Sequence, residues 1–177
     1  RHLCAMGLRP DVLIGDMDSI SPDDDAQTEG VERLEYLAEK DRSDSELAVE
    51  WAFAQGANRI CLMAATGGRL DHLLGHTVLL LRYPGRVCIH EPETFATALR
   101  AGQSQRLETS RCATVSLFSF EQGTVVSNDG LLYPMEREVL RWVTHGLSNR
   151  SKADCFSITV HSGVALMTVE GAQAWIK

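Results

Sequence analysis

The pattern of hydrophobic and polar positions changes character near residue 100. Before that point, short apolar runs alternate with segments of helical periodicity. The runs predict buried strands at 11–14, 34–37, 60–65 and 86–90. Strands that alternate with helices are typical of an α/β layer with a mainly parallel sheet, so we expect a Rossmann-like arrangement in this part of the chain.

Two helices are predicted between these strands. Ser43 and Glu46 fit a capping box, which predicts a helix that begins after Ser43 and ends near Gly56. A second helix is expected from Arg69, with one face formed by Leu70, Leu73, Leu74, Thr77, Val78 and Leu81. The acidic segment 21–29 has the composition of a turn.

After residue 100, helical periodicity fades and short β-rich runs appear at 113–120, 123–126, 156–161 and 164–170. Turn residues separate these runs at 128–130 and 162–163. We therefore expect two domains, an α/β domain over residues 1–103 and an all-β sandwich over residues 104–177.

Composition narrows the classes of function. The chain has 177 residues, 44% hydrophobic and 23% charged, which is ordinary for a globular protein. Its net charge of −7 argues against binding to nucleic acid, which normally requires a basic face. A nucleotide substrate is compatible with this charge if a divalent cation mediates the contact. Because there is no apolar run of about 20 residues, we expect no membrane span, and we recognise no signal peptide.

The cysteines are odd in number and widely spaced, at Cys4, Cys61, Cys88, Cys112 and Cys155. This spacing is neither a zinc-ligand pattern nor a disulfide framework. We interpret them as free thiols in a reducing cytoplasm, mostly buried as small hydrophobic residues.

Three polar clusters lie where predicted strands end or helices begin. Asp16 and Asp18 follow the first strand, and residues two apart in extended chain project to the same side. Two such carboxylates suit Mg²⁺, although the segment could also be an acidic turn that caps a helix. In the second cluster, Ser43 and Asp44 suit a helix N-terminus, which is a structural role, but phosphate also binds there and Lys40 could take part.

The third cluster covers residues 67–72. Its paired glycines let phosphate approach backbone N–H groups, and Arg69 could bind phosphate oxygens. Asp71 could hold a metal or accept a proton, whereas a histidine such as His72 in a first helical turn is more often a packing residue. Neither GxxxxGK[ST] nor GxGxxG occurs. Together the three clusters predict a polyphosphate site with Mg²⁺.

The spacing of two further segments, 130–134 and 146–149, by itself predicts two turns with one packed tyrosine. Taken in order, however, all these segments resemble the thiamine pyrophosphokinase family, over nearly the whole chain. The family pattern GD-x-DS, D-x-TD, GG-R-x-DH, GL-x-Y/W and SN stands here at 15–19, 41–44, 67–72, 130–133 and 148–149. Ser43 replaces the usual threonine and keeps its hydroxyl.

The resemblance implies transfer of the pyrophosphoryl group of ATP to the hydroxyl of thiamine, which gives thiamine diphosphate and AMP. It implies a nucleotide-binding catalytic domain, a thiamine-binding sandwich, and a homodimer with active sites between subunits. The catalytic residues would be Asp16, Asp18, Asp44, Arg69 and Asp71, with Mg²⁺ on the four aspartates. The ATP phosphates would contact Lys40, Asp41, Ser43, Gly68, Arg69 and His72. The thiamine pocket would include Tyr133, Ser148 and Asn149.

Members of this family usually begin with a further strand and an Asp-Gly-Gly segment, and this chain opens at Arg1 without either, so we expect an N-terminal truncation. Two other functions stay open. The Asp16-Met17-Asp18 segment also resembles the DxD motif of Mg²⁺-dependent phosphohydrolases of the haloacid-dehalogenase type, but Ile20 stands where Thr or Val is expected. The third possibility is a thiamine-binding dimer without catalysis.

Overall fold

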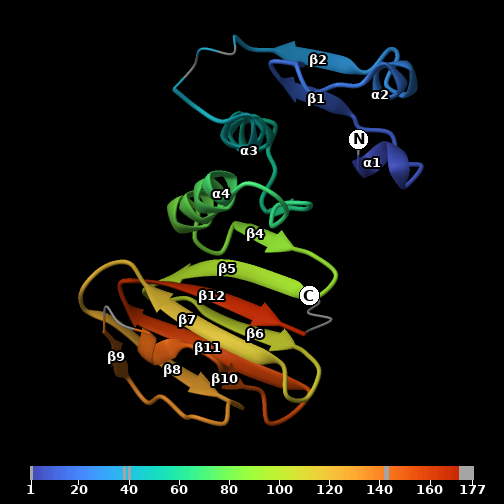
Figure 1. The fold of residues 1–177 in the computed structure, drawn as a ribbon. Helices are drawn as coiled ribbons and strands as arrows, with labels where there is room; N and C mark the ends of the chain where they lie inside the picture. The colour runs from blue at the N-terminus through green and yellow to red at the C-terminus, as the bar shows by residue number, and fades with distance from the viewer. Residues whose placement is uncertain (1, 38, 40, 142–143, 172–177) are drawn as a thin grey trace. The chain divides into compact units, whose positions relative to one another are not determined.

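The computed structural model of the protein describes residues 2–37, 39, 41–141 and 144–171. The chain divides into two compact units, residues 1–58 and 59–177. Figure 1 labels the elements of each. The boundary predicted between residues 103 and 104 lies inside the second unit, because strands from both sides of it pair in one sheet.

The first unit contains helices α1 (His2–Ala5), α2 (Pro22–Gln27) and α3 (Asp44–Ala54) and strands β1 (Val12–Gly15) and β2 (Glu32–Glu35). The two strands pair in parallel. Helix α3 packs against β1 and buries Leu47 and Val49. The predictions of β1 and α3 are confirmed, and β2 begins two residues earlier than predicted.

The acidic segment 21–29 was expected to be a turn, but it contains α2. The Oγ atom of Ser21 accepts a hydrogen bond from the Asp24 N–H at 3.1 Å and caps the helix. Pro22 occupies the first turn, where its missing N–H costs no helical hydrogen bond. Three aspartates in that turn favour the positive end of the helix dipole. The same residues that suggested a loop therefore stabilise a helix start.

The second unit is built mainly of two β-sheets (Figure 1). The six-stranded sheet has the order β10-β7-β12-β5-β4-β3, with β3 at Ile60–Leu62, β4 at Val87–His90, β5 at Thr94–Arg100, β7 at Thr114–Ser119, β10 at Asn149–Arg150 and β12 at Val164–Glu170. The four-stranded sheet has the order β6-β11-β8-β9, with β6 at Ser104–Glu108, β8 at Thr124–Asp129, β9 at Glu138–Leu140 and β11 at Cys155–Ser162. Helix α4 (Leu70–Arg82) and the short 3₁₀ helix η1 (Thr144–Gly146) complete the unit.

Side chains from both sheets share one hydrophobic core. In β11 every second residue is buried, and Phe156, Ile158 and Val160 point into this core. The four strands predicted after residue 100 are confirmed as β7, β8, β11 and β12. Parallel pairing among the described strands occurs between β1 and β2 and between β3 and β4, whereas β4 and β5 are antiparallel. The fold is therefore mixed α/β and rich in β-sheet.

Helix α4 packs on β4, β5 and β12, and the predicted apolar face takes part only along one side, where Leu73, Thr77 and Leu81 are half-buried. Its buried residues are Leu79 and Leu80. Leu70, Leu74 and Val78, which lie on the predicted face, are 70%, 57% and 60% exposed. The helix is apolar on more than one side, so periodicity alone did not identify the buried side. With 13 residues α4 is the longest described helix, and no described helix has the length and hydropathy of a membrane span.

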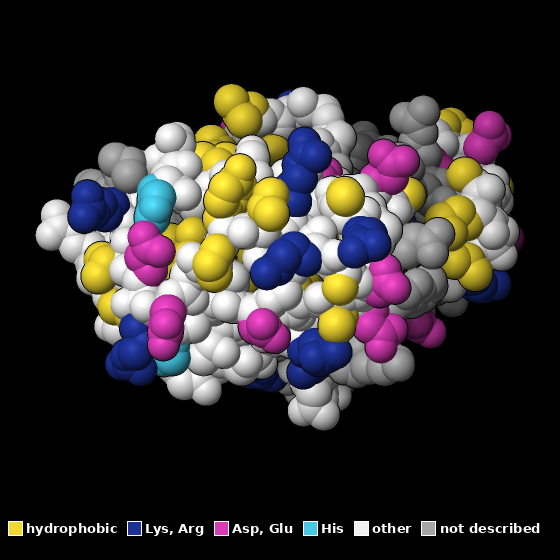
Figure 2. All heavy atoms as spheres, turned by 90° about the horizontal axis from the view of Figure 1, so that it is seen from below, with side chains coloured by type: hydrophobic (Ala, Val, Ile, Leu, Met, Phe, Trp, Pro, Cys, Tyr) yellow, Lys and Arg dark blue, Asp and Glu magenta, His cyan; other side chains and the backbone are white. Residues whose placement is uncertain are grey.

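One face of the molecule is shown in Figure 2. Basic and acidic side chains are interspersed on it, with hydrophobic side chains between them. Positive charge is therefore not concentrated in one patch on this face.

Candidate active site

The carboxyl group of Asp44 lies directly against the end of β1. A Cβ atom on Gly15 would stand 3.0 Å from both Cγ and Oδ2 of Asp44, so the glycine permits this close approach. The Oδ1 atom of Asp44 is shielded from solvent. Helix α3 thus brings its first residue to the segment that carries Asp16.

The chain turns sharply after Gly15. Met17 has a φ angle of 62°, which is uncommon for a residue with a side chain. The N–H of Asp18 donates to Oδ1 of Asp16 at 3.3 Å. Asp16 is half-buried and Asp18 exposed. The segment from Asp16 to Asp18 therefore bends at Met17 and is not the extended chain predicted from the sequence.

The second cluster forms the start of α3. The Oγ atom of Ser43 accepts a hydrogen bond from the Glu46 N–H at 3.2 Å, so the predicted cap is confirmed. Asp41 is exposed beside it. Lys40 lies outside the described residues. The contacts of these residues with phosphate stay a prediction.

In the second unit, Arg69 and Asp71 form a two-point ion pair at the start of α4. Arg69 donates through Nη2 to Oδ2 of Asp71 at 2.6 Å and through Nε to Oδ1 at 3.1 Å. This hydrogen bond holds the pKa of Asp71 below its ordinary value, and the same contact raises the pKa of Arg69. The N–H of His72 also donates to Asp71, at 3.0 Å. Asp71 is therefore an ionised acceptor at neutral pH.

The loop before α4 has free space around its glycines and is held by hydrogen bonds at Ala65. Gly68 has a φ angle of 91°, and a Cβ atom on it would meet nothing within 4 Å. The buried Ala65 donates its N–H to Oε1 of Glu91 at 2.6 Å and accepts from Nδ1 of His76 at 2.9 Å. Glu91 and His76 belong to none of the sequence motifs, and only the structure identifies them as supports of this loop.

In the β half, Asn149 holds the backbone around Tyr133. Its Nδ2 donates to the Tyr133 carbonyl at 2.7 Å, and its Oδ1 accepts from the N–H groups of Tyr133 at 2.9 Å and Arg150 at 2.8 Å. The side chain of Asn149 is buried, whereas Tyr133 is exposed. Both residues border a cavity of about 320 Å³ that Glu138 and His145 also line, with Nε2 of His145 3.2 Å from Oε1 of Glu138.

Helix η1 and the turn that follows it pack closely against β7. Gly146 is buried there, and a Cβ atom on it would overlap the carbonyl oxygen of Leu117. Ser148 follows with a φ angle of 57° and donates its N–H to Oγ of Ser116 at 3.0 Å. The structure therefore brings Tyr133 and Asn149 to one cavity, with the exposed Ser148 immediately beside them in the chain.

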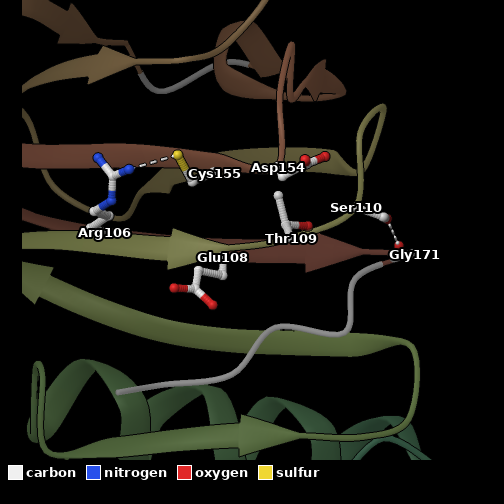
Figure 3. A pocket seen from close by; sticks show the side chains of 7 residues that line it. All are labelled: Arg106, Glu108, Thr109, Ser110, Asp154, Cys155 and Gly171. Carbon is white, nitrogen blue, oxygen red and sulfur yellow. Dashed lines mark hydrogen bonds between the residues drawn. The ribbon is translucent and has the colours of Figure 1, made fainter.

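A larger cavity, of about 700 Å³, contains none of the predicted site residues. Figure 3 shows its lining from β6, the start of β11 and the adjoining loops. There Arg106 points toward Cys155 and donates to its Sγ atom at 2.8 Å. Among the residues that the structure describes, no three Asp, Glu, His or Cys side chains come together in a way that could hold a metal ion.

Comparison with known proteins identifies the class to which this fold and these residues belong. Residues 1–89 match the sequence profile described as thiamin pyrophosphokinase, catalytic domain. The chain therefore belongs to the thiamine pyrophosphokinase family.

Individual relatives are similar to this chain in sequence or in fold. A thiamine pyrophosphokinase of Bacillus subtilis is 37% identical over 78 residues, which is 43% of this chain and 36% of the relative. The aligned part thus spans about a third of that relative's length. The crystal structure of thiamin pyrophosphokinase from Geobacillus thermodenitrificans has a TM-score of 0.80 at 28% identity and matches 96% of this chain and 81% of its own. That of thiamine pyrophosphokinase from Bacillus subtilis has a TM-score of 0.83 at 23% identity over 96% and 82%.

Proposed function

We propose that the protein is a thiamine pyrophosphokinase, which transfers the pyrophosphoryl group of ATP to the hydroxyl of thiamine and releases AMP. The observation that carries this proposal is the match of residues 1–89 to the catalytic domain of the family. That segment includes the Asp16–Asp18 turn, Asp44 at the start of α3, and the Arg69–Asp71 pair.

Residues 1–103 would form a Rossmann-like domain that binds ATP, and residues 104–177 a β-sandwich domain that binds thiamine. The parallel pairs β1–β2 and β3–β4 support the α/β character of residues 1–103. Ligands of open α/β sheets bind beyond the carboxyl ends of parallel strands. The Asp16 turn follows β1 at such an end, and the Gly68 loop follows β3.

The aspartates of the first unit suit Mg²⁺ in their chemistry. Carboxylate oxygens are hard ligands, and the carboxyl group of Asp44 lies against the residue that precedes Asp16. Mg²⁺ is usually held by one or two carboxylates together with substrate phosphates, so a preassembled set of protein ligands is not required. Asp16, Asp18 and Asp44 would hold it, with Asp71 as a further ligand. When bound, the ion would neutralise charge on the triphosphate.

The remaining residues of the site would position the phosphates and the attacking hydroxyl. A guanidinium has five N–H groups, and two of those of Arg69 are directed at Asp71, so the others can donate to phosphate oxygens. Gly68 leaves room for phosphate next to its backbone. Lys40, Asp41, Ser43 and His72 would also contact the phosphates of ATP. Because such transfers need little covalent chemistry from the protein, positioning and charge stabilisation would account for most of the rate.

The cavity beside Tyr133 would receive thiamine. The exposed aromatic ring of Tyr133 offers a stacking surface for a flat heterocycle, and Glu138 places a carboxylate on the wall of the same cavity. Asn149 would act as a positioning residue, because its amide is directed at the backbone of Tyr133. Ser148 would contribute from the exposed turn beside it.

A homodimer would cover the exposed apolar face of α4. Leu70, Leu74 and Val78 form a row at helical spacing and are all more than half exposed. This row lies in the helix that begins with the Arg69–Asp71 pair, which would place an intersubunit contact near the phosphate site. We also propose a cytoplasmic location, with which the free thiols of Cys61, Cys88, Cys112 and Cys155 agree.

Release of AMP from ATP, with and without thiamine, tests the proposed activity. We expect AMP to form with Mg²⁺ only when thiamine is present, together with thiamine diphosphate in equal amount. The assay is made on this chain and on the natural gene product with any residues that precede Arg1. Phosphate release without thiamine would instead indicate a phosphohydrolase, and thiamine binding without turnover in both proteins would indicate a non-catalytic dimer.

Substitution of one carboxylate tests the metal role. Asp18→Asn keeps the shape of the side chain and removes a charge, so we expect the rate to fall by at least about 10²-fold, or about 2.7 kcal/mol of barrier. Asp23→Asn is the matched control, because Asp23 is an exposed aspartate of α2 in the same unit. Near-normal turnover of the Asp18 variant would reject the proposed role of Asp18.

A further inference from the structure

Two cysteines stand side by side on neighbouring strands of the six-stranded sheet. Cys61 in β3 and Cys88 in β4 are register partners of a parallel pair, so their side chains project to the same face. Both border a cavity of about 270 Å³ whose wall also includes Arg59 and Arg86. The spacing of the cysteines along the sequence did not reveal this pairing.

The geometry of the pair is suited to a covalent link. Neighbouring strands lie about 4.8 Å apart. The Cα atoms of disulfide-bonded cysteines are usually about 4.4–6.8 Å apart, so register partners fall within this range near its lower end. Among the described strands of the second unit, β3 is the last in its sheet and pairs with β4. Small shifts of β3 can therefore bring the two sulfur atoms into bonding position without loss of the sheet.

The two thiols differ in their surroundings. Cys61 is exposed, whereas Cys88 is half-buried and packs against the hydrophobic core. Burial, together with the charge of and a hydrogen bond with the neighbouring Cys61, raises the pKa of the Cys88 thiol to about 12. The positive charge of Arg59 acts in the opposite direction. Cys88 is therefore a protonated thiol at neutral pH, and an oxidant from solvent reaches Cys61 first.

We propose that Cys61 and Cys88 form a redox-sensitive dithiol, which a peroxide converts into an intrachain disulfide. In the first step the Cys61 sulfur attacks one oxygen of hydrogen peroxide, which gives a sulfenic acid and one molecule of water. In the second step the sulfur of Cys88 attacks the Cys61 sulfur, the S–S bond forms, and the hydroxyl leaves with the Cys88 proton as a second water. Two electrons pass from the two thiols to one peroxide, and a dithiol reductant reverses the change.

The disulfide would tie β3 to β4 and close the chain around α4. The loop that carries Gly68 and Arg69 begins where β3 ends, so its first residues would be held more firmly in the oxidised protein. This proposal concerns the cysteine pair alone and does not depend on the proposed kinase activity.

Peptide mapping of the whole protein tests the proposal. Trypsin cleaves after arginine, which places Cys61 in peptide 60–69 and Cys88 in peptide 87–100. After treatment with limiting peroxide and alkylation, we expect these two peptides joined by a disulfide that dithiothreitol releases. The exposed Cys112 serves as an internal reference and should still be alkylated at that dose.

Two variants test the order of the steps. In Cys61→Ala, the Cys88 thiol should be lost at least about tenfold more slowly than in the unmodified chain, because the half-buried, protonated Cys88 thiol reacts with peroxide itself less readily than with a sulfenic acid formed beside it on Cys61. Cys112→Ala is the matched control and should leave the rate unchanged. The proposal is overturned if Cys61 proceeds to sulfinic acid while Cys88 stays a thiol, or if Cys112 is oxidised first. The peptide map of the unmodified chain decides the matter even where a variant folds poorly.

Discussion

Replacement of Asn149 by alanine should remove the support of the Tyr133 segment. The Asn149 amide makes three hydrogen bonds to backbone groups, at 2.7, 2.8 and 2.9 Å. Its side chain is only 4% exposed, so water cannot replace the amide without local opening. The loss should therefore appear first as a change in stability and in the mobility of the Tyr133 backbone.

The size of the effect follows from the groups left behind. The N–H groups of Tyr133 and Arg150 lose their acceptor, whereas the Tyr133 carbonyl keeps a bond from Nδ2 of Asn128 at 3.1 Å. An unsatisfied buried group costs about 1–3 kcal/mol, so two donors in a partly exposed loop should cost about 2–4 kcal/mol in the free energy of unfolding. For a domain of this size the melting temperature should fall by about 5–15 °C.

Urea unfolding and amide hydrogen exchange measure the two effects. Asn149→Ala should be destabilised by the amount above, with faster exchange of the Tyr133 amide. Asn128→Ala is the matched control, because Asn128 donates one hydrogen bond to the same Tyr133 carbonyl. Within the described residues the Oδ1 atom of Asn128 has no hydrogen-bond partner, so this variant should lose less than about 1 kcal/mol of the free energy of unfolding. Equal losses in the two variants, or unchanged exchange at Tyr133, would refute the reasoning. If Tyr133 borders thiamine, the KM for thiamine should also rise more than the KM for ATP.

Two further predictions concern the close turn and the Arg69 pair. Gly146→Ala should lower the free energy of unfolding, measured in urea, by more than about 3 kcal/mol, because the added methyl group would overlap a backbone carbonyl of β7. Gly75→Ala is the control, since Gly75 on α4 faces open space, and it should change that free energy by less than about 1 kcal/mol. Similar values for both variants would contradict the packing argument. Arg69→Gln should raise the pKa of Asp71 toward its ordinary value, because the hydrogen bond from Arg69 is the main cause of its lowering. Because the pKa of Asp71 is lower in the folded protein than in the unfolded chain, this group stabilises the folded state at pH values above its unfolded pKa. That contribution is lost as the pH falls through the pKa of the folded state. The variant should therefore lose less stability on acidification, and an unshifted carboxyl titration of Asp71 by NMR would disprove the link.

Strand prediction succeeded where one face of a strand differs from the other. In β11 buried and half-buried residues alternate, and the sequence shows the same period. Strand β5 was not predicted because five consecutive residues of it are buried. It lies in the sheet between α4 on one side and the sandwich core on the other, so both of its faces are apolar and the period of two disappears.

The sequence by itself determined which chemical groups this protein carries and the order of its motifs along the chain. Five short motifs indicated the family, and local rules placed the Ser43 cap and the end of β1, because caps and strand periods depend on residues a few positions apart. The tertiary structure alone decided which distant residues meet. It placed Asp44 against Gly15 and turned the amide of Asn149 toward the Tyr133 backbone.

The same holds for the cysteines. Their spacing indicated only separate thiols, yet the register of β3 and β4 pairs Cys61 with Cys88. Such contacts arise from the packing of whole elements, and they depend on sheet order and strand register. A one-residue change in register would send each side chain to the opposite face, and no local pattern in either segment specifies its partner.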